Sequence, residues 1–142
     1  MSADENKVIA RQLTEALNAG NMDKLHELLS PEFVSHFPGV PTPMTREQYG
    51  QFNKMVKAAF PDFKQTIEDS IAEGDKVVLR MTARGTHNGT FQGIAATGKQ
   101  FEITGITIRR IADGKIVEEW ANPDQLGMMQ QLGAFPSPSS QK

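Results

Sequence analysis

The sequence predicts an α+β protein in which N-terminal helices pack on a strongly curved antiparallel β-sheet. Apolar residues recur at helical spacing up to Phe60 and then at alternate positions from Phe63 onward. Turn sequences, such as Asn-Gly at 88–89 and Asp-Gly at 113–114, separate the alternating segments, as in a meander. Helices that precede strands along the chain are typical of α+β folds.

Three helices are expected in the N-terminal half, because three amphipathic segments carry start and stop signals. The third also shows a clear apolar stripe from Tyr49 to Phe60. The caps and terminating residues are Ser2 with Glu5 and then Gly20, Asn21 and then Pro31, and Thr45 with Gln48 and then Pro61.

Four long strands are expected to follow, at residues 63–72, 76–87, 99–111 and 115–122. Strands of this length predict a strongly curved sheet with a concave face. In the third strand, Gly105 predicts a bulge or sharp bend, because the apolar positions change parity around it. A short helix at 124–132 completes a single domain of residues 1–133, and the Pro- and Ser-rich residues 134–142 predict a mobile tail.

Composition excludes several classes of function. The 142 residues include 15 basic and 17 acidic side chains, so the formal charge of -2 argues against a nucleic-acid partner. The absence of cysteine excludes disulfides, thiolate metal sites and cysteine nucleophiles, and the three histidines lack metal-ligand spacing, so no metal is expected. No apolar segment approaches the roughly 20 residues that span a bilayer, so a cytoplasmic protein without a membrane partner is expected.

Polar residues that share a strand face with apolar ones are the candidate site residues, since successive side chains point to opposite faces. His87 shares its face with apolar residues that include Met81, and Asp69 shares a face with Ile67 if no bulge intervenes. His36, beside Phe37, is expected at the mouth of a cavity. The last strand carries a longer inward series after Ile116, consisting of Glu118, Trp120, Asn122 and Asp124.

Each candidate also has a purely structural interpretation. His87 lies beside a turn and can bond neighbouring backbone groups. Asp124 can be the N-cap of the C-terminal helix, and Asp69 can be a bulge or edge residue. Glu118 is equally suited to pair with an arginine across the sheet, and Trp120 to line the core or a pocket wall.

An ordered set of motifs resembles the SnoaL-like polyketide cyclase (ester cyclase) family. The set comprises EGD at 73–75, GTHNG at 85–89, TGK at 97–99, DGKIVEEW at 113–120 and PDQLGMMQQLG at 123–133. The resemblance spans nearly the whole domain. It implies the cone-shaped α+β fold shared with ketosteroid isomerase and nuclear transport factor two, in which helices and a curved antiparallel or mixed sheet enclose a deep pocket.

The resemblance implies ring closure of a polyketide by intramolecular aldol condensation, without a metal or organic cofactor. It assigns the acid and base role to an acidic residue that matches Asp124. Desolvation in an apolar pocket would suit a carboxylate to both steps. His87 and Asn122 are then expected to orient the substrate or to donate to the enolate oxygen. The substrate is expected to be a small hydrophobic molecule that also contacts Trp120, His36, Asp69 and Met81.

One position departs from the family pattern. The family commonly has Glu-His-Trp where this chain has Glu118, Glu119 and Trp120. By strand parity, Glu119 is expected on the opposite face from the candidate site. If the family histidine takes part in the cyclase chemistry, Glu119 in its place is expected to reduce or abolish that activity.

Other functions stay open at this point. The main rival is a domain that binds a small apolar ligand, or assembles with a partner, without turnover. An isomerase of the same superfamily is disfavoured because it needs a tyrosine on the first helix, whereas the only tyrosine, Tyr49, lies on the third helix. An epoxide-hydrolase-like site is disfavoured because no aspartate has an arginine two positions before it. A cavity of roughly 300 to 1,000 Å³ lined by Asp124 and His87 would favour catalysis.

A homodimer is also expected, because one face of the sheet mixes apolar with charged residues and needs a cover. The residues of this face are Val78, Ile106 and Ile108 among Arg80, Arg84 and Thr104.

Overall fold

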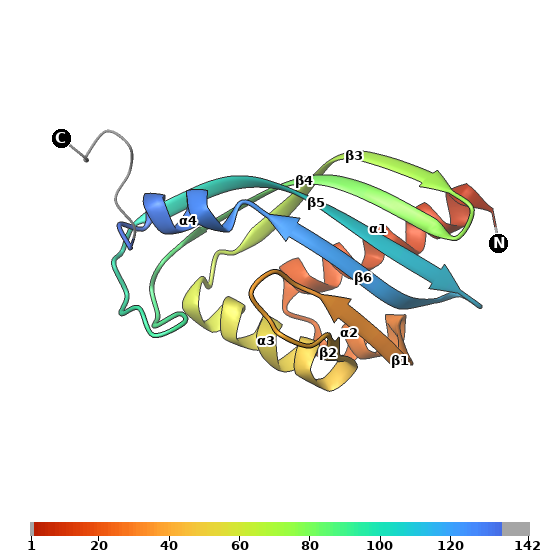
Figure 1. The fold of residues 1–142 in the computed structure, drawn as a ribbon, viewed down its shortest axis with the longest axis horizontal. Coiled ribbons are helices and arrows are strands. Elements are labelled where there is room, and N and C mark those ends of the chain that lie inside the picture. Colours follow the sequence, from red (N-terminus) through yellow and green to blue (C-terminus); the bar gives the residue numbers. More distant parts are fainter. Residues whose placement is uncertain (1, 135–142) are drawn as a thin grey trace.

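A curved six-stranded sheet with helices against it forms the protein in the computed structural model, which describes residues 2–134 (Figure 1). The strand order is β2-β1-β6-β5-β4-β3, and β1 runs parallel to β6 while the other neighbours are antiparallel. The predicted α+β class with a curved mixed sheet is therefore confirmed. The helices are α1 (Ala3–Ala19), α2 (Met22–Leu28), α3 (Arg46–Ala59) and α4 (Gln125–Gln131). The strands are β1 (Leu29–His36), β2 (Met44–Thr45), β3 (Lys64–Glu73), β4 (Lys76–Thr86), β5 (Gln100–Ala112) and β6 (Lys115–Pro123).

The helix starts follow the predicted caps. Both predicted capping boxes form, with Ser2 and Glu5 bonding reciprocally before α1 and Thr45 and Gln48 before α3. Gly20 ends α1 in the left-handed conformation at φ 66°. Because these signals act over three or four residues, they survive whatever the tertiary context is.

The end of the second helix differs from the prediction. Helix α2 ends at Leu28, and the chain continues directly into β1, which contains Pro31. The register of β1 against β6 shifts between Leu29 and Val34, so Pro31 lies where the ladder is interrupted. A proline without an N–H group is tolerated at such an irregular position.

Bulges in two strands change which side chains face the helices. The pairing of β3 with β4 shifts register between Ile67 and Asp69. The pairing of β5 with β6 also shifts register, and it leaves Val117 without a partner residue. One extra residue inverts the facing of every residue beyond it. Beyond Val117, the inward positions are therefore Glu119, Ala121 and Pro123.

No bulge forms at Gly105, although a bulge was one of the two alternatives predicted there. The register between β4 and β5 runs without a shift past this residue, and Phe101, Ile103, Thr107 and Arg109 all lie on the buried face. The glycine is instead needed for close packing, since a Cβ atom there would lie 2.9 Å from the Cα of Pro123 on β6.

Two apolar clusters form the core. One joins α1 and α2 to the sheet and includes Leu13, Phe33 and Leu79. The other joins the end of α3 to β5 and includes Phe60 and Phe101. Within residues 2–134, no helix is long and apolar enough to cross a membrane. Of the predicted tail, residues 135–142 lie outside the described residues.

Candidate active site

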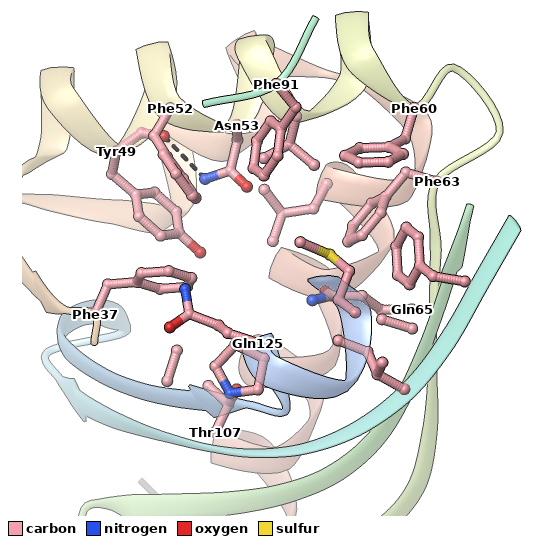
Figure 2. A pocket seen from close by; sticks show the side chains of 18 of the residues that line it. Phe37, Tyr49, Phe52, Asn53, Phe60, Phe63, Gln65, Phe91, Thr107 and Gln125 are labelled. Carbon is pink, nitrogen blue, oxygen red and sulfur yellow. Dashed lines mark hydrogen bonds between the residues drawn. The ribbon is translucent and has the colours of Figure 1, made fainter. Parts of the chain in front are cut away.

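A largely apolar cavity of about 120 Å³ lies between α3 and the inner face of the sheet (Figure 2). Its volume is below the expected range. Tyr49, Phe52 and Asn53 enter it from α3, and Thr107 faces it from β5 on the opposite side. Its aromatic walls come from both core clusters and the loops beside them, with Phe37, Phe52, Phe60, Phe63, Phe91 and Phe101.

A buried carboxylate lies at the wall formed by β6. Glu119 Oε2 accepts a hydrogen bond from the hydroxyl of Tyr49 at 3.1 Å and from Nε of Arg109 at 2.9 Å. Its Oε1 accepts a third bond from the hydroxyl of Ser35 at 3.2 Å. Among residues 2–134, Glu119 is the only one that contributes a carboxylate to the cavity lining.

Arg109 connects this carboxylate to the first helix. Its Nη1 donates to the carbonyl oxygen of Ala10 at 2.6 Å and to the hydroxyl of Thr14 at 2.7 Å. Its Nη2 has no hydrogen-bond partner within residues 2–134, and the residue lines the cavity. A buried charge is tolerated only when it is paired and hydrogen-bonded. The Nη2 group of the guanidinium therefore keeps two N–H groups that a ligand oxygen can use.

Tyr49 is a neutral donor beside that pair. Burial, followed by the nearby charge of Glu119, raises the pKa of its hydroxyl well above the ordinary value. Its ring packs edge-on against Phe33, with the ring centroids 5.0 Å apart. Together, Tyr49, Arg109 and Glu119 form a preorganised group of two donors and one acceptor in an apolar surrounding.

His87 points inward as predicted, and its side chain is fully buried. Its Nδ1 lies 3.1 Å from the hydroxyl of Thr97, and its ring stacks on Phe60 with centroids 5.4 Å apart. The other ring nitrogen, Nε2, has no partner among the described residues. His87 is not one of the residues that line the cavity, whereas Phe60, on which its ring stacks, is one of them. Its catalytic role stays a prediction.

Asp124 does not face the interior as strand parity predicted. Its side chain is exposed, and Oδ1 accepts a hydrogen bond from the N–H of Gly127 at 2.9 Å, so it is the N-cap of α4. The structural interpretation of this residue is confirmed. Its two neighbours, Pro123 and Gln125, line the cavity. Asp124 therefore lies beside the cavity and outside it, and its catalytic role stays a prediction.

Three further candidates lie on the outer face of the sheet. His36 Nε2 lies 2.7 Å from Glu118 Oε2, and the His36 ring stacks on Trp120 with centroids 5.5 Å apart. Asn122 is exposed on the same face. The inward placement predicted for Trp120, Asn122 and Glu118 is wrong because the bulge at Val117 inverts this part of β6. Glu118 instead pairs with Arg110 across the sheet, which confirms its structural alternative. The position of His36 at the cavity mouth is also wrong, because its side chain packs on Trp120 and does not line the cavity.

The remaining two candidates separate. Asp69 is exposed on the edge strand β3 and pairs with Arg80 at 2.6 Å, so the bulge alternative is confirmed for it. Met81 is buried in the core as expected and lines a smaller hollow that adjoins the cavity. The substrate-binding roles of these residues stay predictions.

The polar residues of the cavity were missed by the sequence argument. Glu119 was expected on the opposite face, and no site role was predicted for Arg109. In β5 the signal was the shared parity of Arg109 with Phe101 and Ile103, whereas the facing of Glu119 depends on its pairing with Arg109 in the structure. Within residues 2–134, no group of three or more histidine and acidic side chains is arranged to hold a metal ion.

Comparison with known proteins supports the resemblance in the motifs. Residues 7–132 match the family model described as SnoaL-like polyketide cyclase. The chain belongs to this family. An aklanonic acid methyl ester cyclase (DauD) from Streptomyces sp. (strain C5) is 34% identical to this family member over 137 residues, which are 92% of this chain and 83% of the relative. A nogalonic acid methyl ester cyclase from Streptomyces nogalater is 28% identical over 130 residues, with 85% and 92% of the two chains covered.

Solved structures agree with the cyclase-family fold. The crystal structure of IdmH from Streptomyces antibioticus matches with a TM-score of 0.82 and 38% identity, covering 90% of this chain and 98% of IdmH. The structure of TsrD from Streptomyces laurentii matches with a TM-score of 0.84 and 30% identity, over 95% and 99% of the two chains. The predicted family and cone-shaped fold are therefore confirmed.

Proposed function

We propose that this chain catalyses a cofactor-independent, intramolecular aldol-type cyclisation of a small hydrophobic carbonyl compound. The observation that carries the proposal is the cavity, whose walls are largely aromatic and whose one carboxylate, Glu119, lies beside two hydrogen-bond donors. Family membership supports the same reaction class, because relatives that share about a third of their residues with this chain are named as aklanonic acid methyl ester cyclases.

The chemistry needs a base, an oxyanion site and an acid. A carboxylate removes a proton from a carbon next to a carbonyl group, and the resulting enolate carbon forms a bond to a second carbonyl carbon of the same molecule. The new alkoxide then takes the proton back from the carboxylic acid, so the product is an isomer of the substrate. Arg109 Nη2 is the donor that would stabilise the enolate oxygen, because the single O–H of Tyr49 is already donated to Glu119.

We assign the proton transfers to Glu119 because it is inside the cavity. Asp124 is the alternative carboxylate, carried by the family resemblance, and it would need to leave its bond to Gly127 and turn toward the cavity.

The test is turnover of aklanonic acid methyl ester and nogalonic acid methyl ester, followed by chromatography with mass detection for an isomeric product. We expect Glu119→Gln to lower turnover about 10²-fold or more while Asp124→Asn keeps it, as loss of a general base typically does. The exposed carboxylate variant Glu102→Gln is the matched control. The reverse result would place the base at Asp124. Absence of an isomeric product from either ester with the wild-type chain would contradict the proposed cyclase activity.

One observation favours the rival function, binding without turnover. Both oxygens of Glu119 already accept hydrogen bonds, so its free acceptor capacity is reduced. Tight binding of either ester without conversion, in the same assay, would support this second function.

We further propose that the chain works as a cytoplasmic homodimer. Ile106 is 50% exposed and Ile71 is 64% exposed on strands whose outer face no helix of the described chain covers. A symmetric pairing of that face would remove this apolar surface from water. Light scattering tests it, and a monomer at micromolar concentration would contradict it.

A further inference from the structure

The side-chain amide of Gln65 lies in the cavity wall without a hydrogen-bond partner among residues 2–134. Its Oε1 is fully buried and unpaired, and its side-chain nitrogen donates to no described residue. A buried carbonyl oxygen without a hydrogen bond is rare, because it loses its bonds to water and gains none in exchange, although Gln65 as a whole is half-buried. Gln65 Oε1 can therefore accept a hydrogen bond from a bound ligand, because no described residue donates one.

The backbone around Gln65 holds this side chain in place. The side chain of Asn18 on α1 makes two hydrogen bonds to the backbone of Gln65. It accepts from the backbone N–H at 2.8 Å and donates to the backbone carbonyl oxygen at 2.9 Å. Strand alternation places Phe63, Gln65 and Ile67 on the inner face, before the bulge of β3. The amide is therefore directed into the cavity by the strand and not by a bond of its own.

The groups that line the space around Gln65 are apolar. Gln65 belongs to both the main cavity and the adjoining smaller hollow, whose shared walls include Ala83, Ile103 and Phe37. Figure 2 shows Gln65 across the cavity from Asn53, whose amide nitrogen already donates to the carbonyl of Tyr49 at 2.8 Å. The polar group of Tyr49, Arg109 and Glu119 is thus one recognition point in this cavity, and Gln65 is a second.

We propose that Gln65 is a specificity-determining residue that hydrogen-bonds an oxygen on the aromatic body of the substrate. An amide offers a donor at one end and an acceptor at the other, and rotation exchanges the two, so either a carbonyl or a hydroxyl oxygen fits. The aromatic walls select a flat ring system, and Gln65 selects one that carries an oxygen. This inference rests on the proposed function only in calling the bound molecule a substrate, because the binding itself requires no turnover.

The test measures binding of two probes of similar size, 1-naphthol and 1-methylnaphthalene, by isothermal titration calorimetry. We expect the wild-type chain to prefer 1-naphthol, and Gln65→Met to lose about 5- to 30-fold of that preference, as one buried hydrogen bond would contribute. Gln51→Met makes the same chemical change on an exposed position of α3 and should keep the wild-type preference. Because a general change in cavity shape should affect the affinities for both probes alike, it should not change the ratio of the two affinities.

Thermal melting separates recognition from a structural role. Because the amide has no partner to lose, Gln65→Met should melt at or above the wild-type temperature. A lower melting temperature with an unchanged probe preference would overturn the inference, as would a wild-type chain without preference. If Gln65→Met does not fold, Gln65→Leu carries the same comparison. No turnover is involved, so an inactive chain in the ester assay contradicts the proposed function and leaves this inference standing.

Discussion

Arg109 and Glu119 form an ion pair inside the protein, with 2.9 Å between Nε and Oε2 and side chains that are 1% and 4% exposed. The two residues are direct partners in the β5–β6 ladder. Through Thr14 and Tyr49, the pair also joins α1 and α3 to the sheet. The wall of the cavity is therefore held by the same contacts that would serve its chemistry.

Removing one member of this pair should destabilise the fold strongly. Arg109→Met leaves the Glu119 carboxylate buried without its main partner, and we expect a loss of about 3–5 kcal/mol in the free energy of unfolding. Urea denaturation measures it. The double variant Arg109→Met with Glu119→Leu should recover much of that loss, because no unpaired charge is left buried. A single variant as stable as wild type would contradict the expectation.

The hydroxyl of Tyr49 should make stability depend on pH in the alkaline range. Burial, and then the charge of Glu119, raises its pKa in the folded state above the ordinary value of 10.0, so above that pH the unfolded chain has released a proton that the folded chain keeps. Rising pH therefore favours unfolding. We expect wild type to lose stability relative to Tyr49→Phe above about pH 10 in denaturant titrations. Parallel curves for the two proteins would count against it.

Gly105 should tolerate no side chain. A Cβ atom there meets the Cα of Pro123 at 2.9 Å and the carbonyl oxygen of Asn122 at 3.3 Å. Gly105→Ala should lower the free energy of unfolding by about 1–3 kcal/mol and displace Pro123, which lines the cavity. Gly50→Ala is the matched control, since nothing lies within 4 Å of its Cβ position on α3. Equal effects of the two changes in urea denaturation would refute the packing argument.

The cap role of Asp124 can be separated from any catalytic role. Asp124→Ala removes the bond to Gly127 and should cost about 0.5–2 kcal/mol, whereas Asp124→Asn keeps a good capping side chain and should cost little. Thermal melting compares the two. If Asp124→Asn is stable and inactive, the carboxylate is needed for chemistry. If the two variants melt alike, the cap is not what stabilises α4.

Local signals along the chain predicted the helices well. The capping boxes at Ser2 and Thr45 and the left-handed Gly20 all form as expected, because each depends on residues within one helical turn. The inward position of His87 was also predictable, since β4 pairs with β5 without a register shift. The end of α2 was not, because tertiary pairing recruited Pro31 into β1.

The facing of β6 was not accessible to the same argument. Alternation from Ile116 places Trp120 and Asn122 inside, whereas the bulge at Val117 places Glu119 there instead. In β5, the apolar residues Ile106 and Ile108 concealed the inward positions of Thr107 and Arg109. Bulges arise from pairing between strands, so they leave no dependable mark on either strand alone.

The sequence by itself determined the fold class, the family and the helix boundaries that caps define, because short-range hydrogen bonds and ordered motifs specify them. Only the tertiary structure decided which acid lies in the cavity. A one-residue shift in the β5–β6 pair brought Glu119 into contact with Arg109 and Tyr49, while Asp124 caps α4 outside the cavity. The physical reason is the two-residue period of a β-strand, which turns the smallest change of register into an exchange of inside and outside.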